Sequence, residues 1–332
     1  MNRRKRILFV YRQLSPFVKK DLEILQRHFD VISHQWTTTR DIKNVLRVMW
    51  YVLRTDLSFI WFAGWHAAQV VRISKLFWKK SIVVASGHSV ANMPRINFGL
   101  MISPESARKV IYVLENADKV LAVSEFNKNE ILRYTSHDNI KLIYHGVDFN
   151  KYKPQGKKEE NLVITVGAVT KLHLKRKGLE SFVRTAKFLP DVKFVLIGGH
   201  LDNTIKYLKS IASPNVEFTG FVSGEELLSY YQRAKVYVQV SAHEGFGCSL
   251  AEAMLCECVP VVTECGAIPE VAGDAGFYVP YGDPEATAEA IEEALKSDKG
   301  KEARERIKTM FSIERREKEL AEIIRDLVGV EK

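Results

Sequence analysis

The sequence predicts an α/β protein that contains two successive, doubly wound parallel sheets. Its 332 residues are about twice the length of a typical domain. Short runs rich in β-branched and aromatic residues alternate with longer helical stretches, and this alternation pauses near residue 150 and then resumes. Nearly continuous apolar strands separated by helices are typical of parallel sheets covered on both faces. We therefore expect a domain over residues 1–150, a linker over 151–161 and a second domain over 162–310.

In the first domain, each apolar run is followed by a stretch with helical periodicity. The expected strands are residues 7–11, 29–33, 58–62, 82–85, 119–123 and 141–144. The expected helices are residues 18–28, 42–54, 66–79, 104–116 and 125–134. The segment 151–161 (KYKPQGKKEEN) is charged, contains proline and glycine and lacks periodicity, which predicts a linker.

The second domain repeats this pattern and ends in a helical tail. Its expected strands are residues 162–166, 192–197, 216–218, 236–239, 259–262 and 277–279, with helices between them. Helices are also expected over 284–296 and 313–328, and the C-terminal segment 311–332 is long enough to return to the first domain. Ligands bind beyond the carboxyl ends of the strands in such sheets. Two Rossmann-like domains are therefore expected to face a central cleft.

The positive charge of the chain is concentrated in its first half. Residues 1–160 carry 27 Lys and Arg against 14 Asp and Glu, a net charge of +13, whereas residues 161–332 have a net charge of −4. This asymmetry favours an anionic partner for the first half, namely nucleic acid, a membrane surface or a phosphorylated substrate. None of the usual nucleic-acid-binding signatures is found, so no nucleic-acid partner is expected.

Membrane-spanning and targeting segments are not indicated. The longest stretch without Asp, Glu, Lys or Arg, residues 57–71, has 15 residues, whereas a bilayer span needs about 20. The N-terminus is basic but has too few apolar residues for a signal-peptide core. We expect a cytoplasmic protein that lies peripherally on the membrane. Residues 45–54 (VLRVMWYVLR) suit such an interface, although the same pattern also fits an ordinary helix that covers the sheet.

The segment 241–254 (SAHEGFGCSLAEAM) carries the strongest chemical signal. Glu244 and Glu252 are eight residues apart and flank Gly245-Phe246-Gly247 at an expected junction of loop and helix. Glycine lets the backbone approach a ligand closely, and the N-terminus of a helix presents free N–H groups to a phosphate. A carboxylate one turn into the helix can accept hydrogen bonds from two hydroxyl groups, as in a ribose.

This segment resembles the E-x7-E motif of retaining nucleotide-sugar glycosyltransferases of family 4, which have the two-Rossmann GT-B fold. Other segments resemble that family in the expected order. They are HGVD (145–148), Gly167, Lys177-Gly178, LIGG (196–199), NVEFTGFVS (215–223) and GAIPEVAGDAGFYV (266–279). The resemblance implies transfer of a hexose from a nucleotide-diphosphate sugar, expected to be a UDP- or GDP-hexose, to a hydroxyl acceptor that is a glycan, lipid-linked or phosphorylated.

The resemblance implies catalytic roles for Glu244, Lys177 and His88. Glu244 would hold the transferred sugar, Lys177 would stabilise charge on the leaving diphosphate, and His88 in VVASGH (83–88) would face the sugar. The residues implied in donor binding are Arg176, Gly245, Phe246, Gly247, Ser249, Leu250, Glu252, Phe221, Val222 and Gly167. Arg176 would assist Lys177, Ser249 and Leu250 would meet the phosphates, Glu252 the ribose, and Phe221 with Val222 the nucleobase.

Each of these assignments has a structural alternative. A histidine at a strand end is often only a hydrogen-bonded structural residue, Lys177 could be a solvated lysine, and Glu252 a surface residue. His173 and His200 are interpreted as surface residues. No D-x-D triplet occurs, so neither a metal ion nor another cofactor is expected.

Three departures from the family pattern bear on the site. Ala168 stands where the family often has arginine, so either Arg176 or Lys171 replaces it or the donor phosphate is bound differently. Residues 11–21 stand in place of a glycine-rich acceptor loop, and Glu257 stands where glycine is usual. The rival enzyme classes are a phosphorylase, which would need pyridoxal phosphate bound to a lysine, and a sugar-nucleotide epimerase, both of the same fold.

Overall fold

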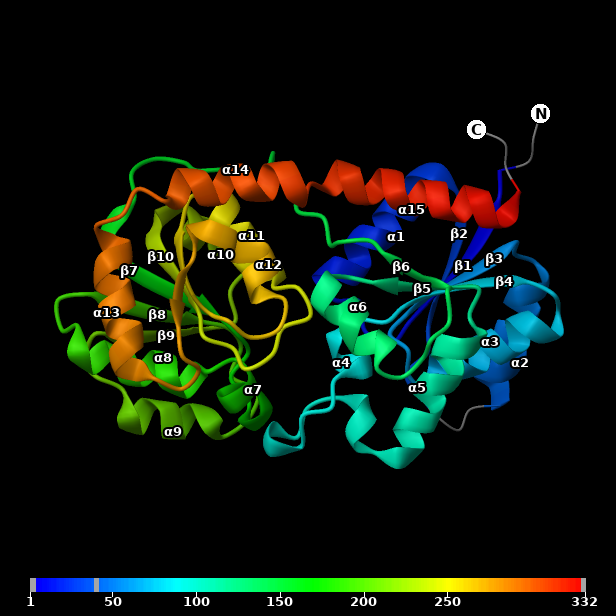
Figure 1. Ribbon diagram of the computed structural model, residues 1–332, viewed down its shortest axis with the longest axis horizontal. Coiled ribbons are helices and arrows are strands. Elements are labelled where there is room, and N and C mark those ends of the chain that lie inside the picture. The colour runs from blue at the N-terminus through cyan, green and yellow to red at the C-terminus, as the bar shows by residue number, and fades with distance from the viewer. Residues whose placement is uncertain (1–3, 39–41, 330–332) are drawn as a thin grey trace. The chain divides into compact units, whose positions relative to one another are not determined.

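The computed structural model describes residues 4–38 and 42–329, which form two compact units (Figure 1). Of the described residues, unit 1 comprises 4–38, 42–146 and 314–329, and unit 2 comprises Val147–Ile313. Each unit contains a six-stranded sheet in which all paired strands are parallel. The predicted fold class, two doubly wound Rossmann-like α/β sheets, is confirmed.

The sheet of unit 1 has the strand order β2-β1-β3-β4-β5-β6. Its strands are β1 (Arg6–Tyr11), β2 (Asp30–Gln35), β3 (Leu57–Trp61), β4 (Lys80–Val84), β5 (Lys119–Ala122) and β6 (Ile140–Leu142). Successive side chains on a strand point to opposite faces. Leu8 and Val10 accordingly join the core under α2, α3 and α5, whereas Phe9 stacks on Phe59 of β3 on the other face.

Helices cover both faces of this sheet. They are α1 (Pro16–His28), α2 (Ile42–Leu53), α3 (Trp65–Leu76), α4 (Gly87–Val90), α5 (Pro104–Asn116), α6 (Glu125–Leu132) and α15 (Ile313–Val328), with the short 3₁₀ helices η1 (Pro94–Ile96) and η2 (Leu100–Ile102). Val48 and Val52 of α2 are fully buried, and Val45 and Met49 pack against the same core. Residues 45–53 therefore lie in a helix that covers the sheet, which is one of the two interpretations of the segment 45–54.

The sheet of unit 2 has the order β12-β11-β10-β7-β8-β9. Its strands are β7 (Glu159–Val166), β8 (Lys193–Ile197), β9 (Val216–Gly220), β10 (Ala234–Gln239), β11 (Val259–Thr263) and β12 (Phe277–Val279). Because β7 pairs with both β8 and β10, the direction of winding reverses at this strand. Doubly wound sheets bind ligands at the carboxyl end of such a switch point.

The helices of unit 2 also form two layers. They are α7 (Lys171–Arg176), α8 (Leu179–Thr185), α9 (Thr204–Ile211), α10 (Gly224–Arg233), α11 (Cys248–Leu255), α12 (Ile268–Ala272), α13 (Pro284–Leu295) and α14 (Gly300–Met310), with η3 (Ala186–Phe188) and η4 (Gly273–Ala275). One core joins α8, α9 and α13 to the sheet. On the other face α10 and α11 contact β10, and α14 contacts α11.

The segment boundaries differ from the expected ones at two places. The chain passes from unit 1 to unit 2 between Gly146 and Val147, and β7 begins at Glu159, inside the segment 151–161 that was interpreted as a linker. Glu159 lies opposite Ala234 of β10, so pairing with a neighbouring strand extends β7 into charged sequence. The helix α14 was not among the tail helices named from the sequence.

Glu257 has a left-handed backbone conformation, which explains why the family pattern usually has glycine at this position. Its φ is +64°, and the turn that ends α11 is closed by hydrogen bonds from Glu257 N to Met254 O (2.9 Å) and from Cys258 N to Ala253 O (3.1 Å). Glycine is preferred at this position of a helix C-cap because it lacks a Cβ. The turn therefore forms here in spite of the side chain.

The C-terminal helix α15 is attached to unit 1 by a buried ion pair. Arg316 donates two hydrogen bonds of 2.7 Å to the carboxylate of Asp21 on α1, and the two side chains are only 3% and 0% exposed. The same guanidinium donates to Ile143 O and Tyr144 O. At the edge of this contact, Glu317 accepts from Arg27 (2.7 Å).

Candidate active site

The residues of the E-x7-E segment lie at the carboxyl ends of β7 and β10 in unit 2. Gly167 follows β7, and the loop that carries Glu244 follows β10. Both strands flank the point where the winding of the sheet reverses, which is where ligands bind in this class of fold. The sheet topology thus places the motif at the expected end of unit 2.

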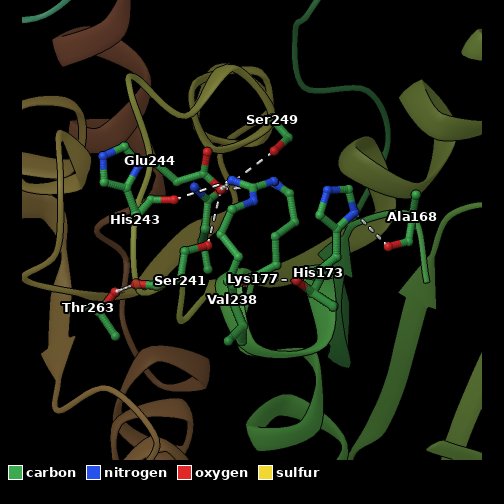
Figure 2. Close-up of polar contacts among 12 residues, drawn as sticks. Ala168, His173, Lys177, Val238, Ser241, His243, Glu244, Ser249 and Thr263 are labelled. Carbon is green, nitrogen blue, oxygen red and sulfur yellow. Dashed lines mark hydrogen bonds and ion pairs between the residues drawn. The ribbon is translucent and has the colours of Figure 1, made fainter. Parts of the chain in front are cut away.

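Backbone hydrogen bonds hold the loop between β10 and α11 in place. Ala242 N donates to Arg176 O (2.8 Å), and Ala267 N donates to Glu244 O (2.9 Å). The hydroxyl of Thr263, at the end of β11, donates to Ser241 O (2.7 Å). Three neighbouring segments therefore fix the backbone on both sides of Glu244, as Figure 2 shows in part.

Glu244 is the centre of a compact charged cluster (Figure 2). One of its carboxylate oxygens, Oε1, lies 3.2 Å from Lys177 Nζ and 3.3 Å from Arg176 Nη1. The hydroxyl of Ser241 donates to the same oxygen (3.2 Å). The side chains of Glu244, Lys177 and Arg176 are 12%, 17% and 11% exposed, so the cluster is largely shielded from water.

The two cations keep Glu244 ionised. Burial by itself raises the pKa of this carboxyl group, but the charges of Lys177 and Arg176, with hydrogen bonds from Lys177 and Ser241, outweigh burial and lower the pKa to about 2. A carboxylate with this pKa is an acceptor of hydrogen bonds at neutral pH and cannot act as a general acid.

Arg176 ends the short helix α7 and Lys177 is its C-cap, and two glycines allow the close packing around them. A Cβ on Gly167 would lie 2.9 Å from Lys177 Cδ, so the lysine stem uses the space that the absent side chain leaves. Gly178 has φ +65°, and a Cβ there would collide with Val240 O. The K-G pair of the sequence motif therefore turns the chain sharply from α7 into α8 beside β10.

Of the two candidates for the arginine missing at Ala168, Arg176 lies beside Glu244. Arg176 Nη1 also donates to His243 O (3.3 Å), and the arginine is 9% exposed. Lys171 is exposed at the start of α7, where its backbone N–H donates to Asp202 (2.9 Å). The structure therefore brings together Arg176, Lys177 and Glu244 among the residues that the sequence singled out.

The first turn of α11 has features that suit an anion. Gly247 occupies the N-cap, no side chain caps the helix, and the first turn carries no acidic residue. Uncapped N–H groups and the positive end of the helix dipole favour negative charge there. Ser249 Oγ donates to Gln239 (3.4 Å). Leu250 is fully buried and Phe246 packs on Phe311, so these two residues can offer a ligand only backbone groups.

Glu252 lies in α11 and is 8% exposed rather than on the surface. It accepts a hydrogen bond from the hydroxyl of Tyr231 (3.4 Å). Burial, followed by the charge of Glu252, raises the pKa of Tyr231, so the tyrosine remains a hydrogen-bond donor. The alternative of a solvated surface glutamate is wrong.

Phe221 and Val222 follow β9 at the same end of the sheet. The Phe221 side chain is 88% exposed, which is unusual for a large aromatic side chain in a folded domain. Gly199 lies just beyond β8, and a Cβ added to it would lie 3.9 Å from Phe221 Cβ. The exposed ring thus stands beside the loop that leaves the neighbouring strand.

His88 belongs to unit 1, where it lies on the short helix α4 just beyond β4. Its ring is exposed and makes an edge-on contact with Phe98, with ring centres 5.3 Å apart. It therefore lies at the carboxyl end of a strand, as VVASGH (83–88) predicts.

Two residues near the charged cluster escaped the sequence analysis. The interpretation of His173 as a surface residue is wrong, because its ring is half-buried and its Nδ1 lies 2.9 Å from Ala168 O. Burial and the Arg176 charge lower the pKa of His173. Gln239, the last residue of β10, is buried, and its Nε2 has no hydrogen-bond partner among the residues that the structure describes. Gln239 could have been noticed in the sequence because it is a polar residue at the end of an apolar strand.

Within residues 4–38 and 42–329, no cluster of three or more His, Cys, Asp or Glu side chains has the geometry of a metal site. In the same ranges, no helix combines the length and the apolar character needed to cross a bilayer.

The charge of Glu244 is expected to make unit 2 sensitive to acid. Because the folded-state pKa of about 2 is below the ordinary value of 4.5, its ionisation stabilises the fold above pH 4.5. This contribution is lost as the pH falls from 4.5 toward 2, and it amounts to about 3 kcal/mol. Urea denaturation should therefore show Glu244→Gln to be less stable than the wild type at pH 6 and close to it at pH 2. A difference independent of pH would contradict the ion-pair account.

Comparison with known proteins identifies the domain that holds this cluster. Residues 160–297 match the family model described as "Glycosyl transferases group 1". The chain is 31% identical over 237 residues to the capsular polysaccharide biosynthesis glycosyltransferase CapM of Staphylococcus aureus, covering 61% of this chain and 61% of CapM. It is 25% identical over 211 residues to the O-antigen chain mannosyltransferase B of Escherichia coli, covering 57% and 54%. The matched stretches thus span less than two thirds of these relatives.

Solved structures share the fold over nearly the whole chain. The crystal structure of Anabaena Alr3699/HepE in complex with UDP and glucose superimposes with a TM-score of 0.79 and 17% identity, covering 97% of this chain and 100% of that one. Sucrose-phosphate synthase from Thermosynechococcus elongatus gives a TM-score of 0.78 at 17% identity, with 99% and 100% coverage. These likenesses confirm the two-sheet GT-B fold. The resemblance stated from the sequence is confirmed as well, since residues 160–297 match the model of the glycosyl transferases group 1 family.

Proposed function

We propose that this protein is a retaining glycosyltransferase that moves a hexose from a nucleotide-diphosphate sugar to a hydroxyl acceptor. The observation that carries the proposal is the cluster of Glu244, Lys177 and Arg176 at the carboxyl ends of β7 and β10. The group 1 family match over residues 160–297 and the names of the relatives support the reaction class.

The charge balance of the cluster suits a diphosphate. Two cations face one carboxylate, so a net positive charge remains for a ligand, and the uncapped first turn of α11 adds to it. In the reaction, negative charge grows on the leaving diphosphate as the bond to the sugar breaks. Preorganised cations in a largely dry site stabilise that charge more in the transition state than in the ground state.

Glu244 then has the role of a fixed anion. Since its pKa is about 2, it would accept hydrogen bonds from the sugar hydroxyls and stabilise positive charge that develops on the sugar ring. The proton of the acceptor hydroxyl must go elsewhere, and the departing phosphate oxygen is the base that we propose. Attack would then occur on the face from which the nucleotide leaves, which retains the anomeric configuration.

The nucleoside part of the donor would lie along α11 and β9. Glu252 would accept hydrogen bonds from the ribose hydroxyls, and the exposed ring of Phe221, with Val222, would border the base. The Anabaena structures that share this fold contain UDP or UDP-glucose, which supports a UDP-hexose as the first donor to test, followed by a GDP-hexose because several relatives are mannosyltransferases.

Glu252→Ala is expected to weaken binding of the donor nucleotide by about 1–3 kcal/mol, because the ribose hydroxyls lose their acceptor. Isothermal titration calorimetry measures this loss. Tyr231→Phe is the matched control, since it removes the hydroxyl that bonds Glu252 (3.4 Å) but leaves the carboxylate in place. Equal affinities of the wild type and Glu252→Ala would contradict the ribose assignment.

The acceptor is proposed to be a sugar or lipid-linked hydroxyl that meets unit 1 near His88. CapM is named for capsular polysaccharide biosynthesis and LpcC of Rhizobium leguminosarum for lipopolysaccharide core biosynthesis, which supports a growing glycan as acceptor. The experiment is incubation with UDP- and GDP-hexoses and a panel of glycan and lipid-linked acceptors. Proton NMR of the product reads the anomeric configuration, and an inverted product would contradict the retaining mechanism.

A further inference from the structure

The outer face of α2 carries large apolar side chains that no residue within the described ranges 4–38 and 42–329 covers. Ile42, Leu46, Trp50 and Leu53 are 76%, 60%, 49% and 54% exposed. Their spacing of three and four residues places them on one side of the helix, whereas Val48 and Val52 on another side are fully buried in the core. The helix is therefore apolar on its packed side and on part of its exposed side.

The neighbouring helix α3 ends in a second exposed apolar group. Helices α2 and α3 contact each other on the same face of the sheet (Figure 1). Leu76, the last residue of α3, is 66% exposed, and Trp78, two residues later, is 95% exposed. We call Ile42, Leu46, Trp50, Leu53, Leu76 and Trp78 the α2–α3 surface.

Trp78 has a backbone conformation that glycine adopts more easily than other residues. Its φ is +55°, and the helix end is closed by hydrogen bonds from Trp78 N to Lys75 O (3.1 Å) and from Lys79 N to Ser74 O (2.8 Å). Glycine is common at this position of a C-cap. The local fold therefore gives no reason for a bulky aromatic residue here, and the side chain gains almost nothing from burial.

The charge around this surface is strongly one-sided. Residues 42–104 carry eight Lys and Arg and one acidic residue, Asp56, a net charge of +7 in a chain with a net charge of +9. Asp56 is itself engaged, since it accepts from Arg6 N (2.8 Å). The exposed basic side chains are Lys43 and Arg47 on α2, Arg54 directly after it, and Arg72 and Lys75 on α3. Arg54 lies over the ring of Trp50 at 4.0 Å.

We infer that the α2–α3 surface docks on an anionic lipid bilayer. Tryptophan with aliphatic side chains, flanked by Lys and Arg, is the composition of helices that lie in the plane of a membrane interface. The apolar side chains would enter the boundary of headgroups and acyl chains, while the basic side chains would meet anionic headgroups. The charge argues against a second copy as the occupant, because two such surfaces would repel each other when they pair by two-fold symmetry.

This inference concerns unit 1 and does not depend on the proposed transfer reaction. If both hold, a protein docked in this way would reach an acceptor that is itself anchored in the bilayer. A failure of docking would leave donor binding by unit 2 intact, and a failure of donor binding would leave docking intact, so the two results can be told apart.

Co-sedimentation of the full chain with vesicles tests the inference. We expect the protein to pellet with phosphatidylcholine vesicles that contain phosphatidylglycerol and to remain in the supernatant with phosphatidylcholine alone. Binding should weaken at high salt, because the headgroup attraction is screened. The double variant Leu46→Ser/Trp50→Ser should lower the partition coefficient by roughly tenfold or more, since it removes apolar area from the contact. Lys43→Gln/Arg47→Gln should lower it at low salt.

Two variants guard against a loss of fold. Trp78→Gly should weaken vesicle binding while it leaves the melting temperature unchanged or higher, because glycine suits the positive φ. Leu132→Ser, at the end of α6 and 46% exposed in the wild type, is the matched control and should bind vesicles normally. Equal recovery with neutral and anionic vesicles, no recovery with either, or a dimer in sedimentation velocity that Leu46→Ser disrupts would overturn the inference.

Discussion

Replacing Lys177 with alanine is expected to lower kcat for sugar transfer by roughly 100-fold, with a smaller change in KM for the donor. In the free protein Lys177 Nζ lies 3.2 Å from Glu244 Oε1 in a largely buried setting. In the reaction its positive charge would stabilise the growing negative charge of the leaving diphosphate. Because this charge is greater in the transition state than in the ground state, loss of the lysine should affect kcat more than donor affinity.

Lys175→Ala is the matched control for this prediction. Lys175 lies two residues earlier, in α7, and is exposed, so this variant removes the same charge from the adjoining helix without touching Glu244. We expect it to keep wild-type kcat. Steady-state kinetics with the donor varied at saturating acceptor measure both variants. If Lys177→Ala and Lys175→Ala turn over at the same rate, the cation that stabilises the leaving group is not Lys177.

Replacing Asp21 with alanine is expected to destabilise unit 1 by about 3–5 kcal/mol, because the guanidinium of Arg316 would remain buried without its partner. Arg316 and Asp21 are 3% and 0% exposed and share two hydrogen bonds of 2.7 Å. The same change would loosen the attachment of α15 to α1. Urea denaturation followed by tryptophan fluorescence measures the loss, since Trp61 is buried in unit 1.

An exposed ion pair on the same helix provides the control for Asp21. Arg315 and Glu319 are paired at 3.0 Å one turn apart, with side chains 45% and 28% exposed. Pairs of this kind contribute about 0.3–0.5 kcal/mol, so Glu319→Ala should leave the denaturation midpoint nearly unchanged. If Asp21→Ala lost as little stability as Glu319→Ala, Arg316 would have found another partner or water. The buried pair would then not be what holds α15.

The strands were predictable because parallel sheets buried on both faces need nearly continuous apolar sequence. Residues 57–61 and 259–263 are buried at every position, and their composition shows it directly. The helix α14 escaped because its sequence GKEARERIKTM buries only Gly300, Ala303 and Ile307, too few apolar residues for a clear helical period. The start of β7 escaped because pairing with β10, rather than composition, extends it into charged residues.

The charged cluster was predictable only in part. Motif order on the chain singled out Glu244, Lys177 and Arg176, and the sheet topology brings both cations within 3.3 Å of the Glu244 carboxylate. The pKa of Glu244 is lowered by Lys177 and Arg176 against the effect of burial, and no sequence spacing supplies the two ion-pair distances. The burial of Glu252 beneath Tyr231 and the contact of His173 with Ala168 O likewise depend on tertiary packing. The left-handed Glu257 and Trp78 contradict the usual preference for glycine, so residue preferences alone would miss both turns.

The central claim is that the Glu244 cluster of unit 2 binds a nucleotide-diphosphate sugar, and calorimetric titration tests it most directly. UDP, GDP and ADP, each free and as hexose conjugates, would be titrated into the wild type and into the variant Arg176→Ala/Lys177→Ala. The account predicts that one nucleotide series binds the wild type and binds the double variant at least about tenfold more weakly, since each charged hydrogen bond to phosphate contributes about 1.5–3 kcal/mol. Binding of no nucleotide, or equal binding to the wild type and the double variant, would contradict it.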